Sequence, residues 1–228
     1  MKPMILCTLI ILLAGPAYAE DYLPLETGNF WSYVSDEGLY DMRVVLDPVP
    51  LLDGNPYPIE YIISTNNQGL VNYWTSEPDG GVLLWGFWRE TWGIAYDPPI
   101  RMVDAPLFVG KAWNNTVESY SLPDLVPYMT FDFNYTVSED PVLTVPAGEF
   151  PTFGIGEPDP EGKRLLDGRF TLCGELITDK TVVVDNWWSL GVGIVQENLG
   201  GLMKLETYTD HPVAVEVSSW GEVKALYR

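Results

Sequence analysis

The sequence Trp-Trp-Ser-Leu-Gly-Val-Gly-Ile-Val-Gln-Glu-Asn at residues 187–198 decides the fold class, because it has the pattern of two strands joined by a tight turn. Aromatic residues precede the turn and β-branched residues follow it, and both kinds are enriched in strands. Gly191 and Gly193 can adopt positive φ angles that other residues avoid, so they mark a turn or bulge. We therefore expect a β-hairpin, with Trp187 and Trp188 packed where the sheet closes on its core.

Alternating patterns predict strands in most of the remaining chain. Residues 129–137 place apolar side chains on one face and polar side chains on the other without interruption. Further strand-like runs are residues 40–47, 57–64, 70–76, 171–178 and 202–209. Turn-forming sequences lie at residues 53–55, 78–81, 158–162 and 167–168. Strands that recur about every 8 to 12 residues predict an all-β fold, either a meander, a sandwich or a barrel.

One eight-residue pattern occurs twice. Residues 24–31 and 106–113 share Pro-Leu-x-x-Gly-x-x-Trp. In each copy the proline blocks an incoming strand, the glycine permits a turn, and the tryptophan begins the next strand. We expect two β meanders that face a common core, each entered through the same turn.

The first 19 residues have the features of a secretory signal peptide. Lys2 supplies the positive charge, an apolar stretch follows, and Ala-Tyr-Ala ending at Ala19 is a cleavage sequence before Glu20. The apolar stretch is shorter than the about 20 residues that cross a bilayer, and no later run is longer, so we expect no transmembrane segment in the mature chain. These features predict export to the periplasm or the exterior, with residues 20–209 as a single β domain.

Residues 210–228 form a different kind of segment. It begins with a linker that contains His211 and a proline, which separates the tail from the last predicted strand. Ser219 and Glu222 have the spacing of a helix-capping box. We expect a linker and a short C-terminal helix. A helix this short is marginal alone, so it either packs on the sheet or serves as a docking or sorting tail.

Charge and cysteine content exclude several classes of protein. Removal of the predicted signal leaves 11 basic and 32 acidic residues, a net charge of −21. Such a surface repels nucleic acid and anionic lipid headgroups. Cys173 is the only cysteine after the predicted cleavage site, so no internal disulfide forms and stability must come from burial. We interpret Cys173 as a small core residue on a strand.

The sequence lacks the usual catalytic residues. His211 is the only histidine and stands in the predicted linker, which argues against a serine triad and a histidine-based metal site. Glycine-rich phosphate-binding patterns are absent. Glu157, Asp159 and Glu161 alternate on a proline-rich loop, but they form no complete calcium loop, so we predict neither a metal nor another cofactor. A hydrolase that uses two carboxylates stays open as an alternative.

Trp85, Trp88 and Trp92 form the densest aromatic group. If exposed, they would make a platform for sugar rings or apolar ligands, and if buried they would form a wall of the core. Alternation places Trp85 and Trp88 on opposite faces of a strand and makes Trp88 the better candidate for exposure. With Trp187 and Trp188, these residues are our candidate ligand-binding set. No catalytic residue is predicted.

Three motifs resemble a known family. They are Tyr-Leu-Pro-Leu-x-x-Gly-x-x-Trp-x-Tyr at residues 22–33, Val-Pro-Ala-Gly-Glu-Phe at residues 145–150, and Trp-x-x-Gly-Val-Gly-Ile-Val at residues 188–195. Together they resemble the TapB-like group of exported bacterial β-rich proteins of unknown function. The resemblance implies an exported protein whose antiparallel meander forms a strongly curved sheet or partial barrel, and it assigns no catalytic residue.

These observations favour an exported protein without catalytic activity. Its expected partner is a small apolar ligand, a glycan or an envelope protein. Two alternatives stay open, a carbohydrate-binding module that uses Trp88 and its neighbours, and a carboxylate-based glycoside hydrolase.

Overall fold

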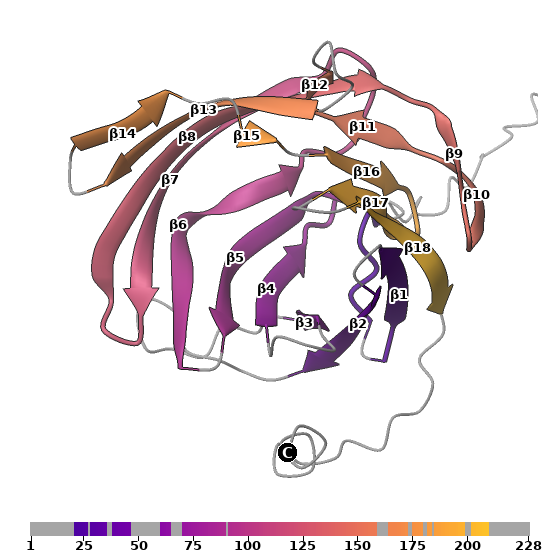
Figure 1. Ribbon diagram of the computed structural model, residues 1–228, viewed down its shortest axis with the longest axis horizontal. Coiled ribbons are helices and arrows are strands. Elements are labelled where there is room, and N and C mark those ends of the chain that lie inside the picture. The colour runs from indigo at the N-terminus through magenta and orange to yellow at the C-terminus, as the bar shows by residue number, and fades with distance from the viewer. Residues whose placement is uncertain are drawn as a thin grey trace, which may run out of the picture.

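The predicted fold class is confirmed, because the structure is an all-β protein built on one strongly curved antiparallel sheet (Figure 1). The computed structural model describes residues 21–26, 28–35, 38–46, 60–64, 70–89, 91–158, 164–172, 175–179, 182–183, 185–198 and 202–209. The predicted signal peptide, Cys173, His211 and the C-terminal segment lie outside these ranges. In the described part of the chain, no helix has the length and apolar character needed to cross a bilayer.

The first nine strands are β1 (Phe30–Ser35), β2 (Gly38–Leu46), β3 (Glu60–Ser64), β4 (Leu70–Ser76), β5 (Val82–Arg89), β6 (Trp92–Val103), β7 (Ala112–Leu122), β8 (Val126–Glu139) and β9 (Val142–Val145). The others are β10 (Gly148–Pro151), β11 (Phe153–Ile155), β12 (Glu157–Pro158), β13 (Arg164–Leu172), β14 (Glu175–Asp179), β15 (Val182–Val183), β16 (Asp185–Ser189), β17 (Gly193–Asn198) and β18 (Leu202–Thr209).

The topology is a meander whose last strands return to its first. Strands β1 to β8 are each paired with the next in sequence, and β16, β17 and β18 pair in turn until β18 lies beside β1. Strand β11 pairs with β16 on one side and, over two residue pairs, with the end of β8 on the other. The two predicted meanders are therefore parts of one 16-stranded sheet, because β6 and β7 pair and join them.

The hairpin predicted at residues 187–198 is confirmed as β16 and β17. Gly191 and Gly193 have φ of 73° and 102°, and a bulge separates Trp187 from Trp188. The uninterrupted pattern at residues 129–137 lies within β8.

Two local predictions are wrong. Residues 171–178 are not one strand, since Leu172 pairs with Glu175 and the run is divided between β13 and β14. Asp167 and Gly168 are not a turn, since they lie inside β13 and pair with β8. In both places pairing with neighbouring strands decided the conformation, and local residue preferences did not.

The repeated pattern at residues 24–31 and 106–113 folds as the same turn twice. Gly28 and Gly110 have φ of 98° and 88°, which only glycine adopts without strain. Asn29 Nδ2 donates to the carbonyl oxygen of Pro24 at 2.8 Å. In the second copy Lys111 Nζ donates to the carbonyl oxygen of Pro106 at 3.1 Å. Each tryptophan indole then donates to a distant backbone carbonyl, Trp31 to Val192 at 2.6 Å and Trp113 to Arg101 at 2.9 Å. The sequence repeat is therefore a structural repeat.

Residues 21–26 join distant parts of the curved sheet through hydrogen bonds. Their backbone carbonyl oxygens accept hydrogen bonds from Gly191 N and Ser76 Oγ, both at 2.9 Å. Tyr22 Oη accepts one from Leu107 N at 3.3 Å. The buried side chains of this segment, which join the core, are Tyr22, Leu23 and Leu25.

Strands β9 and β10 form a separate hairpin over β17 and β18. Pro146 and Ala147 form its turn, and Gly148, the first residue of β10, has a φ of 139°. Ala147 N donates to the carbonyl oxygen of Leu205, and the ring of Phe150 meets that of Tyr208 edge to face. The hairpin thereby adds a second layer to the core at this place.

Candidate binding sites at Trp92 and between β6 and β7

Trp187 and Trp188 are core residues. Trp188 is fully buried, and Trp187 is 8% exposed and donates from Nε1 to Glu139 Oε1 at 3.3 Å. The structure therefore places both tryptophans in the core, as the sequence indicated, and neither side chain is exposed to a ligand.

Trp85 and Trp88 are both partly buried on β5. Trp85 Nε1 donates to Thr75 Oγ1 at 2.9 Å. Gly93 lies against Trp88 so closely that a Cβ atom there would stand 2.8 Å from the ring. The bulge between Leu84 and Gly86 also interrupts the alternation that made Trp88 the candidate for exposure.

Trp92 is the exposed member of the aromatic group. It begins β6, and its side chain is 48% exposed. The edge of this indole meets the ring of Phe87, with centroids 5.4 Å apart and planes at 80°. Phe87 in turn packs on the hydrophobic core. The exposed side chain of Trp92 is therefore an apolar contact area whose position is fixed by the core beneath it.

The turn between β7 and β8 extends this apolar surface. Gly93 pairs with Leu122 at the end of β7, so the residue next to Trp92 lies beside the start of that turn. Leu125, Val126 and Tyr128 are exposed by 38%, 54% and 43%. We call Trp92 and these three side chains the rim surface.

A second candidate site lies where β6 and β7 separate. Their pairing ends at Asp97 and Glu118. The next residues of β6 are Pro98 and Pro99, which have no N–H group to donate to a neighbouring strand. Asn115 of β7 spans the space between the two strands, because its side-chain amide makes the hydrogen bonds that a backbone peptide group makes in a regular sheet.

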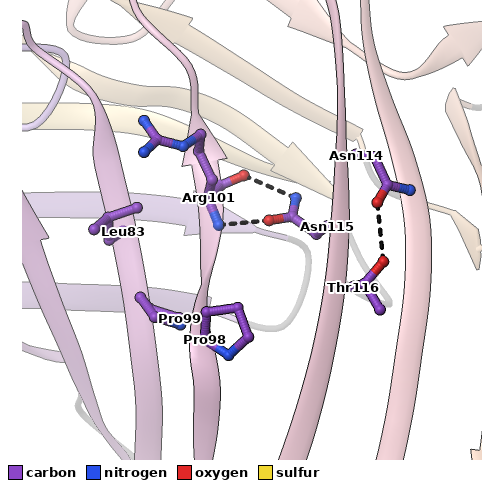
Figure 2. A pocket seen from close by; sticks show the side chains of 7 residues that line it. All are labelled: Leu83, Pro98, Pro99, Arg101, Asn114, Asn115 and Thr116. Atoms are coloured by element: carbon purple, nitrogen blue, oxygen red, sulfur yellow. Dashed lines mark hydrogen bonds between the residues drawn. The ribbon is translucent and has the colours of Figure 1, made fainter.

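The Asn115 amide satisfies both backbone groups of Arg101. Arg101 N donates to Asn115 Oδ1 at 2.8 Å, and Asn115 Nδ2 donates to the Arg101 carbonyl oxygen at 3.1 Å. Asn115 is 5% exposed, so this pairing is shielded from water. Figure 2 shows the two bonds side by side.

The separation leaves a pocket of about 250 Å³, which we call the β6–β7 pocket. Figure 2 shows its lining residues, which are Leu83, Pro98, Pro99, Arg101, Asn114, Asn115 and Thr116. Leu83 comes from β5 and the prolines come from β6, as does Arg101, whereas Asn114, Asn115 and Thr116 come from β7. The pocket thus has one apolar wall and one polar wall.

The Arg101 guanidinium is held by acidic partners. It pairs with the Glu77 carboxylate, and Nη1 lies 3.5 Å from Asp104 Oδ1. Asp104 also pairs with Lys111 at 3.0 Å. The positive charge of Arg101 is therefore already balanced by acidic side chains.

The polar wall continues onto the outer surface of β7 and β8. Asn114 Nδ2 donates to Asp132 Oδ1 at 3.0 Å and to Asn134 Oδ1 at 3.1 Å. Thr116 Oγ1 lies 3.0 Å from Asn114 Oδ1 and 3.2 Å from Asp132 Oδ1. Asn114 and Thr116 are exposed, so water or a ligand can reach them.

A partly buried carboxyl group, that of Glu197, lies on β17. Burial raises the pKa of Glu197 from 4.5 to about 7. The neighbouring Tyr33 has its pKa raised well above 10 by burial and by the charge of Glu197. Tyr33 donates from its hydroxyl to the Ile194 carbonyl oxygen at 2.8 Å. Tyr33 belongs to the core, and neither residue lines the pocket.

Sequence reasoning did not find the β6–β7 pocket. Its signal is the Pro98-Pro99 pair within a run that otherwise reads as a strand, since proline interrupts pairing there. Within the described ranges, no group of three or more His, Cys, Asp or Glu side chains is arranged to hold a metal ion.

No protein family model matches the chain, and no curated protein does either. Two solved structures show a distant likeness. One, from Bacteroides fragilis, is described as an exported protein with a YmcC-like fold, with 13% identity, a TM-score of 0.48, and coverage of 83% of this chain and 99% of that one. The other, from Parabacteroides distasonis, is described as a lipoprotein, with 12% identity, a TM-score of 0.39, and coverage of 84% and 99%. Neither likeness is close enough to assign a family or a function to this chain.

Proposed function

We propose that this is an exported bacterial protein, without catalytic activity, that binds an apolar ligand or an apolar part of an envelope protein on the rim surface. The predicted signal peptide supports export, and the motifs that resemble the TapB-like group agree with it. The observation that carries the binding role is the exposure of Trp92 over Phe87.

The rim surface has the features of a binding site. Aromatic side chains supply a large contact area at low cost in conformational entropy, and Phe87 fixes the orientation of Trp92 before a partner arrives. Burying a large apolar side chain contributes about 1.5–3 kcal/mol, and these side chains are already about half buried. Four of them together support reversible binding in the micromolar to millimolar range.

A hydrolase is less well supported. A glycoside hydrolase needs two carboxyl groups that face each other across a cleft, about 5 to 10 Å apart. The β6–β7 pocket has no carboxylate in its lining. Asp97 and Glu118 are neighbours across β6 and β7, but both are exposed on the outer surface.

Binding of Nile red, a neutral apolar dye, to the processed protein tests this proposal. We expect Trp92→Ala to weaken dye binding by about tenfold, since about 1.4 kcal/mol of contact is lost. Phe108→Ala is the matched control, because Phe108 is an exposed aromatic residue, 57% accessible, beyond the other end of β6. Equal dye affinity in the wild type and Trp92→Ala would reject the rim surface as the binding site.

Mass spectrometry of solvent extracts from natively purified protein then addresses the natural ligand. We expect a recurring apolar compound that is lost from Trp92→Ala and kept by Phe108→Ala. Extracts without such a compound would leave an envelope protein as the partner and would reject the small ligand.

A further inference from the structure

The β6–β7 pocket is a second site, on the outer surface of the sheet, and the proposed rim surface does not use it. Trp92 is absent from its lining, and the first residues of β6, through Asp97, separate the two. At about 250 Å³ the pocket is slightly smaller than those that hold drug-sized molecules, so its ligand must be small.

The apolar wall fits a ring with aliphatic faces. Pro98 and Pro99 present two pyrrolidine rings, and Leu83 adds a branched side chain beside them. These groups offer carbon and hydrogen to a ligand and no side-chain hydrogen bond. Proline rings are also rigid, so this wall loses little conformational freedom when a ligand binds.

The polar wall is rich in acceptors. The Asn114 Nδ2 donor is already directed to Asp132 and Asn134. A hydroxyl oxygen has two acceptor positions, so Thr116 Oγ1 keeps acceptor capacity after it donates to Asn114 Oδ1. A ligand that donates several hydrogen bonds, as a set of neighbouring hydroxyl groups does, suits this wall.

Charges around the pocket disfavour an anionic ligand. Asp97 and Glu118 stand opposite each other at the last β6–β7 pair, both exposed, and disfavour an anion. Arg101 also lines the pocket. Its own charge is held by Glu77 and Asp104, so it offers little attraction to an anion.

We propose that the β6–β7 pocket binds a neutral sugar ring, with the aliphatic face of the ring on Pro98 and Pro99 and a hydroxyl group of the ring donating to Thr116 Oγ1. A pyranose combines an aliphatic face with neighbouring hydroxyl donors and no charge, which matches both walls. This site is independent of the proposed apolar site at Trp92.

The test is a two-dimensional NMR titration of the processed, isotope-labelled protein with glucose, galactose and N-acetylglucosamine at millimolar concentrations. We expect at least one sugar to shift the side-chain amide signals of Asn114, while the indole signal of Trp92 stays in place. Thr116→Val keeps the shape and removes the hydroxyl, so it should weaken that sugar about fivefold. Thr144→Val, at an exposed position on β9, is the matched control and should leave the affinity unchanged.

Four outcomes would overturn the proposal. The first is that no sugar shifts the Asn114 signals, and the second is that shifts occur only at Trp92, which would place glycan binding at the rim surface. The third is an equal loss of affinity in Thr116→Val and Thr144→Val. The fourth is tighter binding of glucuronate or glucosamine than of glucose, because the pocket would then select charge. None of these outcomes bears on Nile red binding at Trp92.

Discussion

Trp74 and Trp188 meet edge to face in the core, with ring centroids 6.5 Å apart and planes at 70°. Both rings are buried, and within the described part of the chain neither indole N–H has a hydrogen-bond acceptor. Only the ring that supplies the edge can direct its N–H at the face of the other. At least one buried donor therefore stays unsatisfied, at a cost of about 1–3 kcal/mol.

This arrangement predicts an unequal response to replacement of tryptophan by phenylalanine. Trp188→Phe removes an unsatisfied donor together with some packing, whereas Trp31→Phe removes the donor that satisfies the Val192 carbonyl oxygen. We expect Trp188→Phe to destabilise the protein by about 1 kcal/mol less than Trp31→Phe does. Urea unfolding followed by circular dichroism measures both, and equal losses would contradict the prediction.

The two hydrogen bonds between Asn115 and Arg101 predict that loss of the Asn115 amide group lowers the free energy of unfolding strongly. Asn115→Leu has a similar size but leaves the Arg101 N–H without its acceptor in a buried place, so we expect a loss of about 2 kcal/mol. Asn114→Leu, on the exposed side of the same strand, should cost under about 1 kcal/mol. Chemical unfolding compares the two variants. A similar loss in both would show that the two hydrogen bonds do not stabilise the separated strands.

The tip of the β7–β8 turn predicts a stabilising substitution. Leu125 has a φ of 54°, a left-handed conformation that costs a leucine about 1 kcal/mol, and it is 38% exposed. Leu125→Gly should therefore raise the free energy of unfolding by about 0.5 kcal/mol, with the strain relief reduced by the added freedom of the unfolded chain. Val126→Gly, at a strand position, should lower it. A thermal melt of each variant gives the sign, and destabilisation by Leu125→Gly would be the contrary result.

Glu197 predicts a pH dependence of stability. Its folded pKa of about 7 lies above the ordinary value of 4.5, so the folded state holds a proton that the unfolded state releases between these values. The free energy of unfolding should therefore fall as pH rises from about 4.5 to about 7, by at most about 3 kcal/mol from this group. It should then stay constant.

Glu197→Gln isolates this contribution. The variant cannot ionise, so its loss of stability between about pH 5 and about pH 8 should be smaller than that of the wild type. Repulsion among the other carboxylates is common to both proteins and cancels in the comparison. The same pH dependence in both would show that Glu197 does not keep its proton on folding.

Rules that act over a few residues predicted part of the fold correctly. Glycine and β-branched residues at 187–198 specified a hairpin, and the repeated proline, glycine and tryptophan spacing specified the same turn twice. Strict alternation at residues 129–137 specified β8. These features follow from backbone sterics and side-chain periodicity, which a short stretch of sequence carries in full.

The candidate sites were predicted less completely. The aromatic group was recognised, but which member is exposed depends on the bulge in β5 and on Gly93 beneath Trp88. The β6–β7 pocket depends on where two strands part, and on Asn115 meeting Arg101 across the gap. Neither follows from residue type.

The sequence by itself determined the strand content, the repeated turn and the abundance of aromatic residues for the core, because each arises from preferences local to the chain. Only the tertiary structure decided that Trp92 faces solvent while Trp188 is enclosed, that β18 returns to β1, and that Asp167 continues a strand. The physical reason is that burial and pairing depend on partners distant in sequence, whose contributions to the free energy exceed those of local conformational preference.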